Sequence, residues 1–246
     1  MIKKLALIIG FIICLSSCGK DYVYRIEGEL SNLEDQTVYA VFEKDNYKVV
    51  DTVACTKPGQ FQIDQNEVGF HCVTIFFADK EHWVTAYLEP GETVKITGDA
   101  NSPLLLQVKG GRTNDKLTAF KKKIAPLLTE LTNLSNSLNS KDLNDTIEET
   151  DIAARLANVN MQLSEEAIRY VKENPNEEAS VVLIQSFFSD PDDTRKIDEL
   201  LALLNPRLKD FYLVKELEQY SARAKRTALG LSLIHISEPS RRTPIS

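Results

Sequence analysis

Cys18 is the residue whose type and position most directly indicate chemistry. It ends the tetrapeptide Leu15-Ser16-Ser17-Cys18, which follows an apolar segment and has the pattern of a lipobox. In such a motif the cysteine thiol becomes lipidated, and two or more acyl chains are enough for stable anchoring. The sequence therefore predicts lipidation at Cys18, with a bacterial membrane as the partner.

The residues before Cys18 predict export. Met1–Lys4 is basic, and Leu5–Leu15 is almost entirely apolar but too short for a membrane span of about 20 residues. We expect residues 1–17 to be a lipoprotein signal peptide and residues 18–23 to be a tether. An ordinary secretory signal, which would leave the thiol free, is the alternative. Either interpretation places the chain in the cell envelope, facing the periplasm or the cell surface.

Cys55 and Cys72 are the other cysteines that follow the predicted cleavage point. They form no C-x-x-C pair and do not have the spacing of zinc ligands. In an oxidising compartment they can form a disulfide if their strands are neighbours. Alternatively, they are two separate thiols packed as small hydrophobes. With no redox motif present, we predict no catalytic residue in this chain.

Two histidines and two nearby acids are the candidate metal ligands of the sequence. His71 and His82 flank a predicted strand, with Asp79 and Glu81 beside the second of them. Polar residues at the edges of loops explain all four equally well, so no metal and no cofactor is predicted. No nucleophile elbow and no phosphate-binding glycine loop is present either.

Charge and composition favour a globular protein and argue against a nucleic-acid-binding one. The 246 residues are 43% hydrophobic and 26% charged, with a formal net charge of −7. Removal of residues 1–17 takes away Lys3 and Lys4 and leaves −9. A globular fold is therefore expected, and a nucleic-acid partner is not, because no positive field is available for phosphates.

Residues 24–110 are predicted to form an antiparallel β-domain. Apolar and polar residues alternate with the period of a half-buried strand. Pro-Gly pairs separate several of the segments and favour tight turns. Eight strands without intervening helices indicate a β-sandwich or an open barrel. The predicted strands are 24–30, 37–42, 47–53, 60–63, 72–77, 83–88, 93–97 and 104–108.

Residues 111–226 are predicted to be helical, which makes the whole chain α+β. A leucine-rich stripe at residues 117–138 has helical spacing, with a break expected near Ala125 because of Pro126. This stripe indicates an intramolecular core, and a dimer face is the alternative. Further helices are expected at residues 152–171, at 177–188, after an Asp192 cap up to Asn205, and at 207–226.

The last sixteen residues have an unusual sequence. Residues 231–246 resemble the translation of a transposase sequencing adapter followed by an index and a flow-cell sequence, with Ser240 in place of the usual Thr. We interpret residues 231–246 as an adapter artefact and residues 227–230 as a truncated linker. On this interpretation the natural protein continues beyond about Gly230.

Three stretches carry a family resemblance. They are Tyr-Arg-Ile-Glu-Gly-Glu-Leu at 24–30, the segment 87–98 with its Leu-Glu-Pro-Gly turn, and Val-Lys-Gly-Gly-Arg-Thr-Asn-Asp at 108–115. Together they resemble the domain of unknown function 4369, over roughly residues 24–230. The resemblance implies a lipoprotein β-domain followed by helices, which usually stands before a thioredoxin-like thiol-disulfide oxidoreductase domain. The C-x-x-C of that enzyme domain is not found in this chain.

Two functions from different classes are expected on these grounds. The first is a non-catalytic N-terminal accessory module of a membrane-anchored thioredoxin-like oxidoreductase, whose catalytic domain is missing by truncation. The second is a stand-alone periplasmic or surface lipoprotein that binds a ligand or partner through its β-domain. Tyr47, Trp83 and Tyr87 are the first aromatic candidates for such binding, although each can equally pack in the core.

Overall fold

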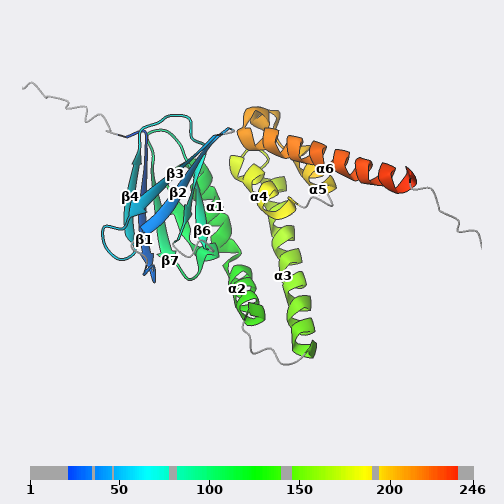
Figure 1. Ribbon diagram of the computed structural model, residues 1–246, viewed down its shortest axis with the longest axis horizontal. Coiled ribbons are helices and arrows are strands. Elements are labelled where there is room, and N and C mark those ends of the chain that lie inside the picture. Colours follow the sequence, from blue (N-terminus) through cyan, green and yellow to red (C-terminus); the bar gives the residue numbers. More distant parts are fainter. Residues whose placement is uncertain are drawn as a thin grey trace, which may run out of the picture.

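Two sheets of four strands each form a β-sandwich in the computed structural model, and helices follow (Figure 1). The structure describes residues 22–34, 37–45, 47–77, 82–139, 146–189 and 194–237. This architecture is the predicted α+β fold, and the two separate sheets make the β-domain a sandwich and not an open barrel.

The first sheet has the order β4-β1-β7-β8 and the second has the order β3-β2-β5-β6. Neighbouring strands are antiparallel except β1 and β7, which run parallel. A parallel pair needs a long crossover connection, and here the strands of the second sheet belong to that crossover. The strands are β1 Tyr24–Ser31, β2 Thr37–Lys44, β3 Tyr47–Ala54, β4 Gln60–Gln65, β5 Cys72–Phe76, β6 Trp83–Tyr87, β7 Thr93–Asp99 and β8 Gln107–Lys109.

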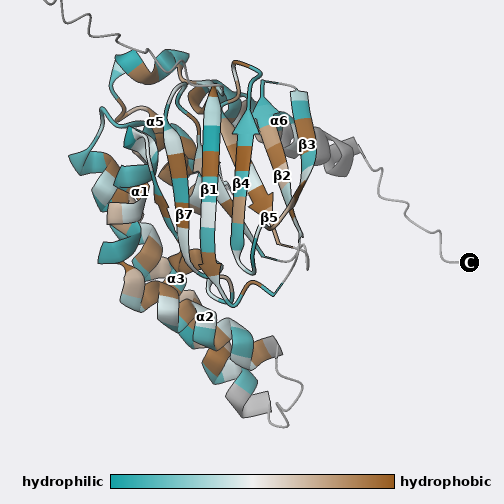
Figure 2. Cartoon of the chain, turned by 90° about the vertical axis from the view of Figure 1, so that its left-hand side faces the viewer, coloured by the Kyte–Doolittle hydropathy of each residue, from teal (hydrophilic) through white to brown (hydrophobic). Residues whose placement is uncertain are grey.

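The alternation seen in the sequence places one face of each sheet in a shared core. In β1, the alternate residues from Tyr24 to Leu30 are buried, while Arg25, Glu27 and Glu29 are more exposed. Figure 2 shows the same alternation of hydropathy along β1, β4 and β7. The opposite sheet contributes Phe42 and Ile75, both fully buried. Burial of these apolar faces is the main source of stability of the sandwich.

The predicted strand at residues 104–108 is only partly correct. Pro103–Leu105 forms a single 3-10 turn, η1, and the strand is limited to β8. Pro103 has no backbone N–H to donate to a ladder, and its fixed φ suits the first residue of a helical turn. The chain becomes extended again only at Leu106, which is buried.

The helical half follows the predicted spacing closely. α1 ends at Lys123 and α2 begins at Ala125, so the break expected near Pro126 is present. α2 and α3 form a pair that extends away from the sandwich (Figure 1). The helices are α1 Arg112–Lys123, α2 Ala125–Asn139, α3 Thr146–Glu173, α4 Glu178–Phe188, α5 Arg195–Leu201, the 3-10 helix η2 Pro206–Asp210 and α6 Tyr212–Ser237.

The last helices differ from the prediction at their ends. Asp192, the predicted cap of α5, lies outside the described residues, and Thr194 occupies the N-cap position. α6 starts at Tyr212 and not at residue 207, because Pro206 opens η2, where the Asn205 side chain accepts a hydrogen bond from the Arg207 N–H. α6 also continues beyond residue 226, through the predicted linker at 227–230, to Ser237.

Polar side chains of α1 close the sandwich along one side, where β6 and β8 are the edge strands of the two sheets. The Asn114 side chain accepts a hydrogen bond from the Tyr87 N–H at 2.9 Å and donates to the Tyr87 carbonyl at 2.7 Å. Thr118 likewise accepts from the Val108 N–H at 3.1 Å and donates to its carbonyl at 2.6 Å. Each side chain therefore makes the two backbone hydrogen bonds that a neighbouring strand would otherwise make.

A glycine pair makes the close approach of α1 possible. Gly110 has φ +99°, and a Cβ on it would lie 2.1 Å from the Thr93 carbonyl oxygen. Gly111 has φ +79°, and a Cβ on it would lie 2.8 Å from the Glu89 carboxylate. That carboxylate accepts a hydrogen bond from the Arg112 N–H at 2.7 Å, where an acidic group favours the start of a helix. Glycine is required at both positions.

We expect Asn114→Ala to lower the free energy of unfolding by about 2 kcal/mol, because it leaves partly buried backbone groups of Tyr87 and Gly110 without this partner. Urea unfolding followed by circular dichroism measures the change. Asn133→Ala, at an exposed position of α2, is the matched control and should stay within about 0.5 kcal/mol of the parent. Equal effects of the two variants would contradict a bridging role for Asn114.

Candidate binding site between the sandwich and the helices

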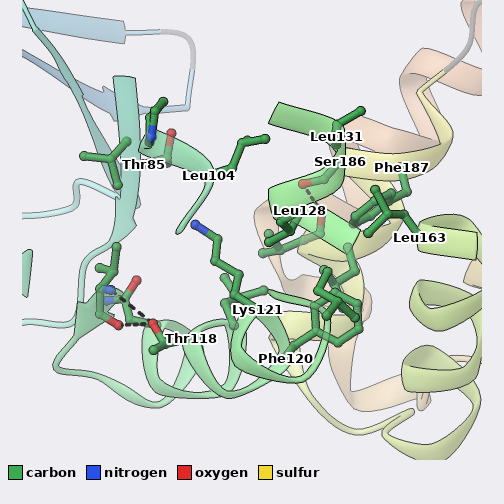
Figure 3. Close-up of a pocket in the computed structure, with 18 of the residues that line it drawn as sticks. Thr85, Leu104, Thr118, Phe120, Lys121, Leu128, Leu131, Leu163, Ser186 and Phe187 are labelled. Carbon is green, nitrogen blue, oxygen red and sulfur yellow. Dashed lines mark hydrogen bonds between the residues drawn. The ribbon is translucent and has the colours of Figure 1, made fainter. Parts of the chain in front are cut away.

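A cavity of about 580 Å³ lies between the second sheet and the helices (Figure 3). Its walls come from β6, η1, β8, α1, α2, α3 and α4. The volume lies within the range of roughly 300–1,000 Å³ that is typical of small-molecule sites. The cavity exists because α1 is held against the edge strands while α2 and α3 diverge from the sandwich (Figure 1).

Most of the cavity wall is apolar. Five of its residues belong to the stripes that the helical spacing predicted as core faces, namely Leu117, Phe120, Ile124, Leu131 and Leu163. They pack helix against helix, and the side chains left uncovered between α1, α2 and β6 line the open space. The apolar lining includes Leu104, Leu117, Phe120, Ile124, Leu128, Leu131, Leu163, Val182, Leu183 and Phe187.

Lys121 is the one charged side chain among the described residues that line this cavity. It extends from α1 into the space between β6 and α2, where Thr85 and Leu128 face it (Figure 3). Burial lowers its pKa, and no carboxylate of the described part of the chain pairs with it. The sequence contains a signal for this placement, since Lys121 is four residues after Leu117 and therefore lies on the same helix face.

Four neutral polar side chains of the wall are already hydrogen-bonded within the protein. Thr85 is bonded to Thr74, Asn114 to Tyr87, Thr118 to Val108 and Ser186 to Val182. These bonds fix the orientation of the four groups. Lys121 is thus a cation held among apolar surfaces and these engaged groups, with Asn160 and Ser164 of α3 as further polar lining residues, and it remains available to an anion.

The three aromatic residues proposed from the sequence occupy different places. Trp83 borders the cavity and is 53% exposed, and Tyr87 lines the cavity from the other end of β6. Burial raises the pKa of Tyr87. Tyr47 is 55% exposed but lies on β3, at the opposite edge of the sheet from β6. The structure therefore brings Trp83 and Tyr87 to one site and leaves Tyr47 apart.

Cys55 and Cys72 are not joined by a disulfide in the described part of the chain. Ala54, next to Cys55, pairs with Thr37 at the start of β2, whereas Cys72 pairs with Glu43 near its end. A strand rises about 3.3 Å per residue, so these positions are on the order of 20 Å apart. A disulfide needs Cα atoms within about 7 Å, and the structure therefore corresponds to the alternative of two separate thiols.

Cys72 has surroundings that suppress thiol chemistry. Its side chain is buried on the outer face of the second sheet, beside Tyr212 of α6, and the thiol donates a hydrogen bond to Glu43 Oε2 at 3.9 Å. Burial, assisted by the negative charge of Glu43, raises the pKa of Cys72 to about 12. The thiolate is the reactive form, so Cys72 is inert near neutral pH.

Of the four candidate metal ligands, the structure describes His71 and His82. His71 Nε2 lies 3.1 Å from Asp45 Oδ1, and its ring stacks on Tyr212 of α6 with centroids 4.1 Å apart. His82 precedes β6, while Asp79 and Glu81 lie outside the described residues. Within the described ranges, no group of three or more His, Cys, Asp or Glu side chains could hold a metal ion. His71 instead contributes to the contact between α6 and the sandwich.

The predicted signal peptide, Cys18 and the tether up to residue 21 lie outside the described residues. In the part that the structure does describe, no helix has both the length and the hydrophobicity needed to cross a membrane. Lipidation of Cys18 stays a prediction.

Comparison with known proteins gives one family match. Residues 24–117 match the family described as Domain of unknown function (DUF4369). The match spans the sandwich and the first half of α1, and all three stretches that carried the resemblance lie within it. No curated protein and no solved structure matched the chain.

We expect iodoacetamide at pH 8 to label Cys55 in the native chain beginning at Gly19, and to leave Cys72 unlabelled, since that thiol is buried and protonated. In denaturant without reductant, both cysteines should be labelled. Intact-mass and peptide mass spectrometry measure the two results. Native labelling of Cys72 at the rate of Cys55 would contradict the inert thiol, and a denatured chain without labels would reveal a disulfide.

Proposed function

We propose, from the premise that residues 24–117 form a DUF4369 domain, that this chain is a non-catalytic accessory module of a membrane-anchored thioredoxin-like thiol-disulfide oxidoreductase. In this role the chain is lipidated at Cys18, faces the periplasm or the cell surface, and is followed by the catalytic domain. It holds that domain at a distance from the membrane.

The observation that carries this proposal is the position of the two ends of the described chain. The chain enters the sandwich beside β4 at one end of the long axis of the molecule, and α6 leaves at the opposite end (Figure 1). Tyr22, the first described residue, is only four residues after Cys18. A lipid at Cys18 and a domain after α6 would therefore be separated by the full length of this module.

The attachment of α6 supports a spacer role. Leu213, Val214 and Leu217 of its first half are buried in a cluster with residues of α4 and α5. Further along the helix, Ser221 donates a hydrogen bond to Asp198 Oδ1 at 2.8 Å, and Lys225 forms an ion pair with the same carboxylate. A helix rises 1.5 Å per residue, so residues 212–230 of α6, which precede the predicted adapter sequence, extend about 28 Å. Such a helix, fixed along its first half, transmits a defined orientation to whatever follows it.

A non-catalytic role agrees with the state of the thiols. Thiol-disulfide exchange starts from an exposed thiolate of lowered pKa, commonly in a C-x-x-C pair. Cys72 has the opposite properties, because burial raises its pKa, and Cys55 lies far from it on the sheet.

The second candidate function is a stand-alone lipoprotein that binds a ligand through its β-domain. The cavity bordered by Trp83 and Lys121 favours it, because one wall of that cavity is strand β6.

Sequencing the uninterrupted gene beyond codon 230 separates the two candidates. We expect the reading frame to continue into a domain that encodes a C-x-x-C motif. A stop codon before any such motif would contradict the accessory-module proposal and favour the stand-alone lipoprotein.

Lipid anchoring has its own test. We expect Cys18→Ser to abolish incorporation of a labelled fatty acid and to remove the protein from the detergent phase of a Triton extract. Cys14→Ser, in the predicted signal peptide, is the matched control and should keep the label. Persistence of the label in Cys18→Ser would overturn the predicted attachment site.

A further inference from the structure

The cavity beside α1 combines two properties that neither the sandwich nor a spacer requires. Its wall is apolar over most of its area, and its one charged lining residue among the described ones, Lys121, has no anionic partner there. An ammonium group in such surroundings loses hydration without gaining an ion pair, which costs free energy in the empty protein. A ligand that supplies the missing charge would remove this cost.

We propose that the cavity binds an amphiphile with a single alkyl chain and one carboxylate, of the fatty-acid type. The carboxylate pairs with Lys121 Nζ, and the alkyl chain lies against Leu128, Leu163 and Phe187. Pairing in a site of low dielectric strengthens the charge-assisted hydrogen bond, and burial of the chain adds about 0.8 kcal/mol per methylene.

The single positive charge of the site favours a ligand group with one negative charge over a group with two. Lys121 stands alone among the described lining residues, without an arginine to form a bidentate fork. It also belongs to the last turn of α1, where the helix carbonyl groups present partial negative charge. A phosphate dianion would meet one cation and this negative helix end, whereas a carboxylate matches the single ammonium.

The rim of the cavity provides both an entrance and a reporter. Trp83 is 53% exposed and Leu104 is 42% exposed, and both line the cavity. A ligand can therefore enter between β6 and η1 without opening the helical core. Trp83 is also the single tryptophan of the chain, so its fluorescence reports occupancy of this site without a label.

The experiment titrates dodecanoate, below its micelle concentration, into the chain beginning at Gly19, which contains every described element. We expect a saturable blue shift of Trp83 emission, and an affinity for dodecanol about tenfold weaker, the change expected for loss of one charged contact. Lys121→Met should weaken dodecanoate binding about tenfold and leave dodecanol binding unchanged. Lys122→Met, at the adjacent exposed position, should bind dodecanoate as the parent does.

Three results would overturn the proposal. The first is the absence of saturable binding, and the second is equal dodecanoate affinity of the parent and Lys121→Met. The third is a Trp83 shift with anionic phospholipid vesicles but not with monomeric dodecanoate, which would identify a membrane surface as the ligand. Retained dodecanol binding shows that Lys121→Met is folded, and Lys121→Gln repeats the test with a polar side chain if it is not.

Discussion

The edge strands β6 and β8, on one side of the sandwich, are the constraint on which the rest of the structure depends. Each edge presents backbone N–H and carbonyl groups that must be hydrogen-bonded when they are buried. Asn114, which is 1% exposed, meets this need at β6, and Thr118 meets it at β8. Because both side chains lie on α1, one turn apart, satisfying the edges also fixes where this helix stands. The position of α1 in turn determines where α2, α3 and α4 lie. It also determines where the cavity between these helices and β6 lies.

The stretches that carry the family likeness have a structural explanation. The Leu-Glu-Pro-Gly turn places Glu89 at the start of α1, where it accepts from the Arg112 N–H, and Gly91 N–H donates to the Val23 carbonyl at the entry to β1. Gly110 and Gly111 leave room for this corner. The residues of these stretches therefore form the junction between the sandwich and its first helix, α1. Its three stretches contain no cysteine and no histidine, and the family match defines a fold more firmly than a function.

Local features were predictable from the sequence, and long-range ones were not. Alternation located the strands, and Pro126 located the break between α1 and α2, because both effects act within a few residues. The parallel pairing of β1 with β7 depends on contacts across more than sixty residues, which no local pattern encodes. The separation of Cys55 from Cys72 follows from the register in which β2 pairs with β3 and with β5. The positions of two cysteines in the sequence do not determine this register. The cavity escaped prediction because Lys121 lies within a run of three lysines that resembles a solvated helix end.

The charge of Lys121 is not required for folding, but it is required for the binding that we propose. Its position, four residues after Leu117 and three before Ile124, is one where a methionine or leucine would pack without loss of hydration. Neither edge closure nor the extension of α6 involves this side chain, so a spacer alone leaves its charge unexplained. A charge kept in an apolar cavity at a cost to stability is instead typical of a binding site, where the ligand restores the lost interaction. A spacer role and a binding role are compatible, because no described residue of α6 lines the cavity.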